Sequence, residues 1–247
     1  MSLTPENKRE KDFHNKLQSG NGQRFENIFY RAISNMFKDF YNYLEKNCKN
    51  KEILDYGCGI GHNVNIVSKF NPSKIVGIDI SEVSIEKAKN NKDKLKNNIN
   101  FISDNCEKSS INSNSFDIIY GSGILHHLKL EKAVDEINRL LKQDGKIIFM
   151  EPLGTNPFIN LYRNLTPKSR SPDEHPLVSK DFKYIKKYFK NLDLKFYGFL
   201  TLLFFPFYRN PDKSALFKIL SNIDQALFKF NFFRKFAWST LIIAKKN

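Results

Sequence analysis

Apolar side chains recur with two different spacings along this chain. Between residues 24 and 47 they lie near helical spacing, which predicts an amphipathic helix or a pair of helices. From Glu52 onward, short apolar runs alternate with helical stretches at about 62–70, 82–95 and 130–142. The runs predicted as strands cover residues 53–56, 74–78, 99–102, 116–120 and 146–150. Strand and helix repeated in this order predict a mostly parallel sheet with right-handed crossovers.

The regular order loosens after Met150. A stretch rich in Pro, Asn and Arg comes first, and a helix is predicted at about 180–190. Two further strands are predicted at 192–200 and 237–244, with a segment rich in Phe and Leu between them. This segment, residues 201–236, is interpreted as an insertion, because a hairpin connection needs only about 2–5 residues.

The sharpest local signal is the stretch Ile-Leu-Asp-Tyr-Gly-Cys-Gly-Ile-Gly-His at residues 53–62. A predicted strand runs directly into three glycines and then into a predicted helix. Glycines at alternate positions allow a tight turn and a close approach to a ligand, and the N–H groups at the helix start favour an anionic group. A dinucleotide fingerprint needs G-x-G-x-x-G. His62 occupies the position of its third glycine, which argues against a dehydrogenase.

Acidic side chains accompany the first three predicted strands. Asp55 lies two positions before the first glycine, Asp79 ends the second strand, and Asp104 ends the third. An acid at the end of the second strand can accept hydrogen bonds from the hydroxyls of a ribose. Because open α/β sheets bind ligands at the carboxyl ends of their strands, these acids and the glycine turn are predicted to line one crevice.

These features together resemble class I S-adenosylmethionine-dependent methyltransferases. The motifs that carry the resemblance are LDYGCGIGH, VGIDIS, FISDNC, FDIIYGSGILHHL and GKIIFMEPLG, in this order across about residues 51–153. The resemblance implies an α/β, Rossmann-like fold in which helices flank a seven-stranded, mostly parallel sheet with one antiparallel strand. The order of the predicted elements adds an N-terminal helical cap (1–50) to a methyltransferase domain (51–247), in which the inserted segments 151–179 and 201–236 are expected to form a substrate lid.

By that resemblance the cofactor is S-adenosylmethionine and the product is S-adenosylhomocysteine. Asp55 and Gly57 would hold the methionine amino end, Asp79 would bind the ribose, and Asp104 with the backbone of Asn105 would hold the adenine. The other residues expected at the cofactor are Cys58, Gly59 and Gly61 in the turn, Ile80 and Cys106 at the adenine faces, and Gly121 and Ser122 beside the methionine moiety. For Ile80 and Cys106, ordinary packing in the hydrophobic core is an equal alternative to a contact with the adenine.

The sulfonium methyl of this cofactor is already activated, so the enzyme mainly aligns the acceptor and removes its proton. His126, after the fourth strand, is the first candidate for the general base, and Glu151 and His175 are further catalytic candidates. The candidates for binding the substrate are His127, Tyr162 and Arg163. Structural roles are the alternatives. The adjacent His126 and His127 could form a turn, Glu151 could hydrogen-bond a neighbouring residue, and the loop that contains His175 could be held in place by its own salt bridges.

The composition fits a folded globular chain without a membrane anchor. Of 247 residues, 40% are hydrophobic and 27% are charged. The longest apolar run, residues 199–207, is shorter than the roughly 20 residues of a membrane-spanning helix, and the first residues lack the apolar core of a signal peptide. The three cysteines, at positions 48, 58 and 106, are not spaced for a disulfide framework or a metal site. A cytoplasmic protein without a metal is predicted, and the oligomeric state is left open.

The formal net charge of +14 is concentrated in the last third of the chain. Residues 163–247 contain 17 basic and 6 acidic side chains, a balance of +11. This balance favours an anionic partner, although lysine and asparagine are also abundant in proteins encoded by AT-rich DNA. Apolar, aromatic and basic residues occur together in 201–236, which suggests peripheral contact with a membrane surface. The alternative is a helical cap that buries its rings against the sheet.

The leading functional prediction is O-methylation of a small-molecule biosynthetic intermediate with an apolar, phosphorylated or glycosylated portion. A carbon or nitrogen acceptor stays open. An RNA or other nucleic-acid methyltransferase is a disfavoured alternative, because YGSGIL stands where amino-methylating enzymes resemble one another in N/D/S-P-P-Y/F, and because the chain contains no Pro-Cys pair. The second alternative is a binding module with the same fold and no catalysis.

Overall fold

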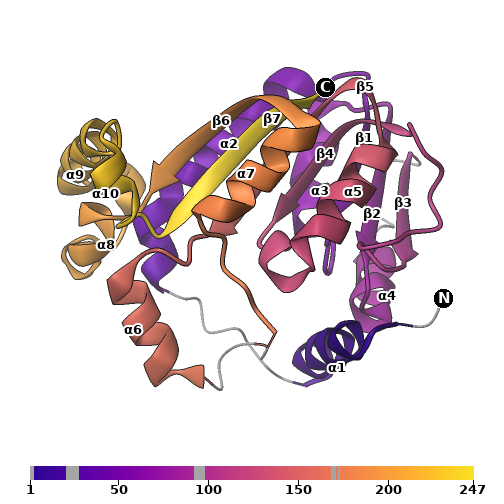
Figure 1. The fold of residues 1–247 in the computed structure, drawn as a ribbon, viewed down its shortest axis with the longest axis horizontal. Helices are drawn as coiled ribbons and strands as arrows, with labels where there is room; N and C mark the ends of the chain where they lie inside the picture. Colours follow the sequence, from indigo (N-terminus) through magenta and orange to yellow (C-terminus); the bar gives the residue numbers. More distant parts are fainter. Residues whose placement is uncertain (1–2, 21–27, 92–97, 168–170, 172) are drawn as a thin grey trace.

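One seven-stranded sheet runs through the structure, a computed structural model that describes residues 3–20, 28–91, 98–167, 171 and 173–247. The strand order is β3-β2-β1-β4-β5-β7-β6, and all neighbouring strands are parallel except the two pairs that include β7 (Figure 1). The predicted Rossmann-like fold with one antiparallel strand is thereby confirmed. The strands are β1 (Glu52–Tyr56), β2 (Lys74–Asp79), β3 (Ile99–Ser103), β4 (Phe116–Ser122), β5 (Leu141–Pro152), β6 (Phe189–Tyr197) and β7 (Ser239–Lys246).

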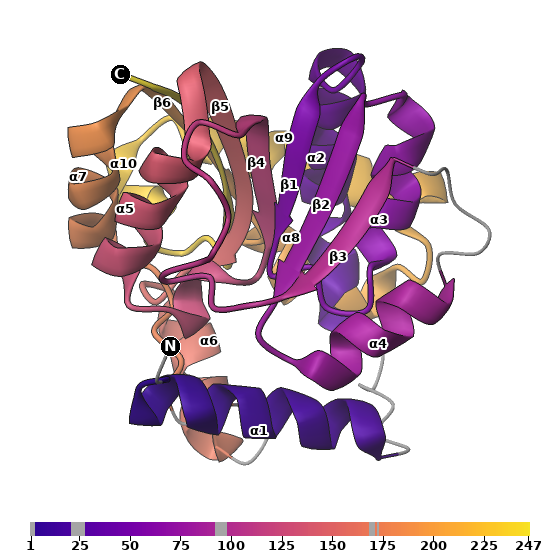
Figure 2. The same ribbon diagram turned by 90° about the vertical axis from the view of Figure 1, so that its right-hand side faces the viewer.

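Helices cover both faces of the sheet, as apolar parallel strands require. One layer consists of α2 (Ser34–Asn47), α3 (His62–Val67) and α4 (Glu82–Asn90), and the other contains α5 (Leu130–Leu140) and α7 (Ser179–Tyr188) (Figure 2). Alternation along β1 serves both layers, since Ile53 packs into the core of the first and Leu54 and Tyr56 into the core of the second.

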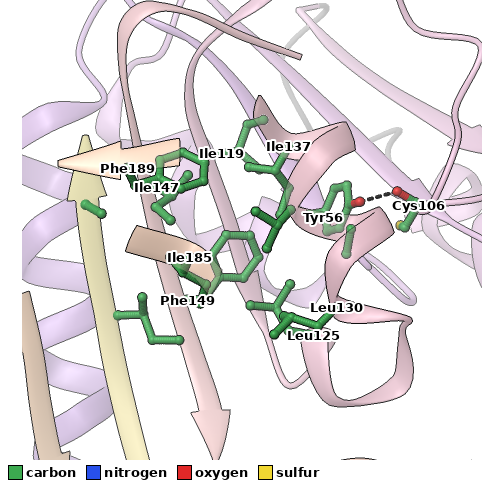
Figure 3. Packing of buried hydrophobic residues seen from close by; sticks show 14 of the residues in the cluster. Tyr56, Cys106, Ile119, Leu125, Leu130, Ile137, Ile147, Phe149, Ile185 and Phe189 are labelled. Atoms are coloured by element: carbon green, nitrogen blue, oxygen red, sulfur yellow. Dashed lines mark hydrogen bonds between the residues drawn. The ribbon is translucent and has the colours of Figure 1, made fainter. Parts of the chain in front are cut away.

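The core beneath α5 and α7 also fixes a loop of the candidate site (Figure 3). Tyr56, Ile119 and Phe149 are buried there, and the Tyr56 hydroxyl donates a hydrogen bond to the carbonyl oxygen of Cys106. A buried tyrosine ring needs such a partner for its one polar atom. The bond ties the loop after β3 to the strand that precedes the glycine turn.

The first five predicted strands lie within the observed ones, but the last two are displaced. The sixth strand, predicted at 192–200, is Phe189–Tyr197, and the seventh, predicted at 237–244, is Ser239–Lys246. Gly198 ends β6 with a φ of +82°, a left-handed conformation that glycine adopts without strain. The apolar residues after it, Phe199 and Leu200, lead into a helix and do not continue the strand.

The N-terminal part contains a helix that apolar periodicity does not predict. Residues 28–47 form a 3-10 helix η1 (Ile28–Ile33) followed by α2, whereas residues 24–27 lie outside the described residues. The unpredicted helix is α1 (Pro5–Ser19), which is almost entirely polar and crosses the sheet near the carboxyl ends of its strands (Figure 2). Thr4 caps it by accepting a hydrogen bond from the Asn7 amide at 3.2 Å.

Two segments extend from the carboxyl ends of β5 and β6. The first contains α6 (Pro157–Leu165), and the second contains α8 (Leu200–Leu203), α9 (Ala215–Leu227) and α10 (Asn231–Arg234), which lie together beyond β6 (Figure 1). The second segment packs on η1 and β6, and its role as a substrate lid stays a prediction. Among the described helices, none has the length and apolar character needed to cross a bilayer.

Asp224 on α9 is expected to be the main polar anchor of this second segment. It is buried, and its carboxylate accepts hydrogen bonds from the Leu200 amide and the Thr201 hydroxyl, each at 2.8 Å. Asp224→Ala leaves these donors unpaired and should lower the free energy of unfolding by roughly 2–3 kcal/mol in urea denaturation. Asp212→Ala, which removes an exposed partner of Lys38, should change it by less than about 0.5 kcal/mol. Equal effects of the two substitutions would contradict the anchoring role.

Candidate active site

Open space lies beside the backbone of the glycine turn that follows β1. Gly57, Gly59 and Gly61 have φ values of +76°, +51° and +81°, the region that glycine favours. A Cβ at Gly57 would lie 2.5 Å from Cγ1 of Ile124, so this position is closed by packing. A Cβ at Gly59 would meet nothing within 4 Å. The middle of the turn therefore has room for a ligand against the main chain.

Asp55 carries a buried carboxylate without a counter-charge. Its side chain is fully buried on β1, and neither carboxylate oxygen makes a hydrogen bond of normal geometry with the described residues, although the nearby Tyr120 hydroxyl partly offsets the effect of burial on the Asp55 pKa. Desolvation raises the pKa of Asp55 to about 8. An unpaired buried acid costs stability unless a ligand supplies its partner, and a positively charged group fits that need.

Asp79 links the glycine turn to the loop after β2. Its carboxylate accepts a hydrogen bond from the Gly59 amide at 2.8 Å and another from the Ser81 amide at 2.9 Å. Desolvation raises the pKa of this carboxyl above its ordinary value. The two amides hold the acid at the edge of the turn, and carboxylate oxygens keep further lone pairs for hydroxyl donors.

Asp104 uses its carboxylate to organise its own loop. It accepts hydrogen bonds from the amides of Asn105 (2.8 Å) and Ser110 (2.7 Å) and from the Ser110 hydroxyl (2.7 Å). Desolvation alone would raise the pKa of Asp104, but these hydrogen bonds outweigh it and hold the pKa below its ordinary value. The Asn105 side chain donates to Asn7 of α1 at 3.2 Å, so α1 contacts the loop expected to hold the adenine.

The remaining predicted cofactor residues surround the turn at different depths. Cys58 and Cys106 are buried, whereas Ile80 and Ser122 are half-buried. A Cβ at Gly121 would lie 2.6 Å from the ring of Phe149, so close packing already explains the glycine at that position. The carboxyl ends of β1, β2, β3 and β4 thus bring the predicted set to one edge of the sheet.

A histidine–carboxylate pair lies beside the turn after β4. Nδ1 of His126 is 2.8 Å from Oε2 of Glu151, and both side chains are buried. The other Glu151 oxygen accepts hydrogen bonds from the amides of Ile124 (2.9 Å) and Leu125 (2.8 Å). Glu151 therefore fixes the turn and orients the imidazole, and among the described residues Nε2 of His126 has no hydrogen-bond partner.

His127 contacts α1, which adds two residues that the sequence motifs do not reveal. Nδ1 of His127 lies 2.8 Å from Oε1 of Glu10, and Nε2 of His14 lies 2.9 Å from the same oxygen. Glu10 is buried although it belongs to a polar helix, and burial lowers the pKa of His127. The only signal in the sequence is the i,i+4 spacing of Glu10 and His14.

Two groups of side chains at this place have the composition of a metal site. One ligand atom each of Glu10, His14 and His127 lies within 4.8 Å of the others, and the same holds for His126, His127 and Glu174. Two imidazoles and a carboxylate can bind zinc or iron. In the structure, Glu10 Oε1 already pairs closely with both rings of the first group.

The other predicted catalytic and substrate residues do not converge on His126 through their side chains. The His175 amide donates to the His126 carbonyl at 2.6 Å, but the His175 ring is half-exposed and its Nε2 lies 3.4 Å from Asp181. On α6, Arg163 donates to the Leu153 carbonyl at 2.8 Å, and the Tyr162 ring packs on Phe29. A cavity of about 520 Å³ between α1, α5 and α7 is lined by His127 and His175, among others.

Comparisons with known proteins identify the family of this chain. A family model described as a methyltransferase domain matches residues 47–193. A sterol 24-C-methyltransferase from Neurospora crassa is 31% identical over 115 residues, which cover 45% of this chain and 30% of that protein. An uncharacterized protein from Methanocaldococcus jannaschii is 31% identical over 141 residues, 56% of this chain and 50% of the other. The chain thus spans at most half the length of these curated relatives.

A solved structure matches over the whole chain. It is a geranyl diphosphate C-methyltransferase from Streptomyces coelicolor in complex with Mg²⁺, geranyl-S-thiolodiphosphate and S-adenosylhomocysteine. The TM-score is 0.69, 10% of the residues are identical, and 100% of each chain is covered. At this identity the likeness concerns the fold alone.

The pKa of Asp55 predicts how stability depends on pH. Because the folded-state pKa is raised from 3.8 to about 8, the folded protein binds more protons than the unfolded chain between these values, and stability should fall as pH rises through that window. Asp55→Asn removes the effect, so its free energy of unfolding relative to the parent should rise by on the order of 1 kcal/mol or more from pH 5 to pH 9.

Denaturant titrations at several pH values measure this difference. Asp12→Asn is the matched control, because it makes the same charge change at an exposed position on α1. A difference between Asp55→Asn and the parent that stays constant with pH would show that the buried carboxyl does not titrate in this range.

Proposed function

Because this chain belongs to the methyltransferase domain family, as its motifs predict, we propose that it transfers a methyl group from S-adenosylmethionine to a small-molecule acceptor and releases S-adenosylhomocysteine. The observation that carries the proposal is the buried, unpaired carboxylate of Asp55 beside the open face of Gly59. An ammonium group bound there would supply the missing partner. The three cysteines are free and buried, which supports a reducing compartment such as the cytoplasm.

Each cofactor residue has a proposed task that follows from its placement. Asp55 and Gly57 hold the amino end of the methionine, and Asp79, fixed by two backbone amides, accepts the ribose hydroxyls. Asp104 shapes the loop in which the Asn105 backbone meets the adenine. The residues proposed to complete the pocket are Cys58, Gly59, Gly61, Ile80, Cys106, Gly121 and Ser122.

His126 is proposed as the general base, with Glu151 as a positioning residue. Bound S-adenosylmethionine supplies an activated sulfonium methyl, so the protein needs mainly to orient the acceptor and accept its proton. Glu151 accepts a hydrogen bond from Nδ1–H of His126, which selects the tautomer with an unprotonated Nε2. Such a nitrogen can take a proton from a hydroxyl acceptor, and this supports O-methylation.

A carbon acceptor is the second candidate, because two of the similar proteins are named as C-methyltransferases. Methylation of an alkene leaves a carbocation that must lose a proton, and the same imidazole could accept it. Both candidates place an acceptor with an apolar portion near α6, where Tyr162 and Arg163 lie, and both retain the two inserted segments as its proposed lid.

The test of the proposed function is incorporation of label from S-adenosylmethionine with an isotopic methyl group, using the parent protein and a fractionated cell extract. Label is expected in the small-molecule or lipid fraction. Asp79→Ala should weaken cofactor binding by at least about 100-fold, because it removes hydrogen bonds to a charged group. Label in nucleic acid would favour the RNA alternative, and cofactor binding without label in any fraction would favour a non-catalytic module.

The assignment of the base makes a separate prediction. His126→Ala should lower kcat by roughly 10²–10⁴-fold while cofactor affinity stays near that of the parent. Glu151→Gln should act in the same direction, because its amide would donate to Nδ1 and leave the proton on Nε2. His175→Ala is the matched comparison, and its half-exposed ring should change kcat by less than about ten-fold. An unchanged kcat in His126→Ala would make the residue structural.

A further inference from the structure

Exposed apolar side chains are concentrated at one end of the molecule. Of the fourteen large hydrophobic side chains exposed in the described residues, twelve lie between residues 158 and 232, and the other two are Tyr30 and Ile60. The twelve belong to α6 and to the segment from α8 to α10, which occupy the same end of the ribbon (Figure 1). Such a concentration of exposed apolar surface marks an interaction site.

Helix α9 has apolar side chains on its outer as well as its inner side. Phe217 and Leu220 face the protein and are buried. Leu216, Ile219 and Ile223, spaced three and four residues apart on one face, are 38%, 57% and 41% exposed. The solvent side of a helix in a globular protein is normally polar, so this stripe does not serve the core.

The charges around the stripe are almost all positive. Residues 201–236 contain six Lys or Arg and two Asp. Both acids are engaged, since Asp224 is buried under α8 and Asp212 lies 2.6 Å from Lys38. Lys218 on α9 and Lys229 just after this helix are exposed, and Lys235 lies over the Phe232 ring at 4.1 Å. The surface therefore combines exposed rings and aliphatic chains with uncompensated cations.

We propose that the α9–α10 face, formed by Leu216, Ile219, Ile223, Phe230 and Phe232, docks on the surface of an anionic lipid bilayer. Apolar side chains enter the boundary between headgroups and acyl chains, and lysines pair with anionic headgroups, which is the composition of interfacial helices. Nucleic acid would engage the cations but would leave the aliphatic stripe in water. The docking does not depend on methyl transfer, so it can be measured with the protein alone.

The test is flotation of the whole protein with vesicles of phosphatidylcholine alone or with 30% phosphatidylglycerol. The parent should float with the anionic vesicles and stay below with the neutral ones. Ile219→Ser/Phe230→Ser removes two exposed apolar side chains and should lower partitioning by roughly ten-fold or more. Lys218→Glu/Lys229→Glu should lower it as well, whereas Lys49→Glu/Lys74→Glu, with the same change of net charge at exposed positions elsewhere, should leave it close to the parent.

Three results would overturn the proposal, provided that thermal unfolding shows each variant folded. The first is a parent that does not float with anionic vesicles. The second is an equal loss of vesicle binding in both charge-reversed variants with no loss in Ile219→Ser/Phe230→Ser. This result would show that net charge alone causes the binding. The third is a parent that is dimeric by light scattering and becomes monomeric in Ile219→Ser/Phe230→Ser, which would make the face an interface between two copies.

Discussion

The left-handed turn after β1 constrains the whole edge of the sheet around it. The amides of Gly57 and Cys58 both donate to the carbonyl of Ile78 at 2.9 Å, so the turn is fixed to the end of β2. On the other side, Gly57 leaves no space for a Cβ against Ile124, which begins the segment leading to His126. The position of the turn thus sets the distance between the end of β2 and the segment leading to His126, and only glycine satisfies both contacts.

Two buried carboxylates at this edge of the sheet differ in whether hydrogen bonds from the protein compensate for their burial. Glu151 is surrounded by three hydrogen-bond donors from the turn after β4, so its burial is compensated inside the protein. Asp55 makes no hydrogen bond of normal geometry, and burial raises its pKa although the nearby Tyr120 hydroxyl partly offsets that effect. A carboxylate whose hydrogen bonds are made within the protein, such as that of Glu151, can hold neighbouring residues in place. A buried carboxylate without such bonds, such as that of Asp55, can receive its partner from a bound ligand.

The parts of the fold and site that depend on local sequence are predictable, and the others depend on distant partners. Alternation and glycine spacing place β1 to β5, the turn and the acids at the strand ends, because each is encoded within a few residues. Glu10 escapes such analysis, since its helix is polar and its partners His127 and Ser171 lie in other segments. The ring of His175 faces Asp181 because of the path of the loop before α7, which its own neighbours in sequence do not specify.

The attachment of α1 has a consequence for the order of folding and opening. Glu10 accepts a hydrogen bond from Ser171, and Arg9 binds Asp173 through two nitrogens at 2.8 and 2.9 Å, so two partners of this helix lie 161 and 164 residues further along the chain, whereas others lie on α4 and in the loop after β3. Closing loops of that length is slow until the sheet has brought their ends together. We therefore expect helix α1 to dock late, on a sheet that has already formed, and because it is held by polar contacts and buries no apolar stripe of its own, we expect its local opening to cost little free energy.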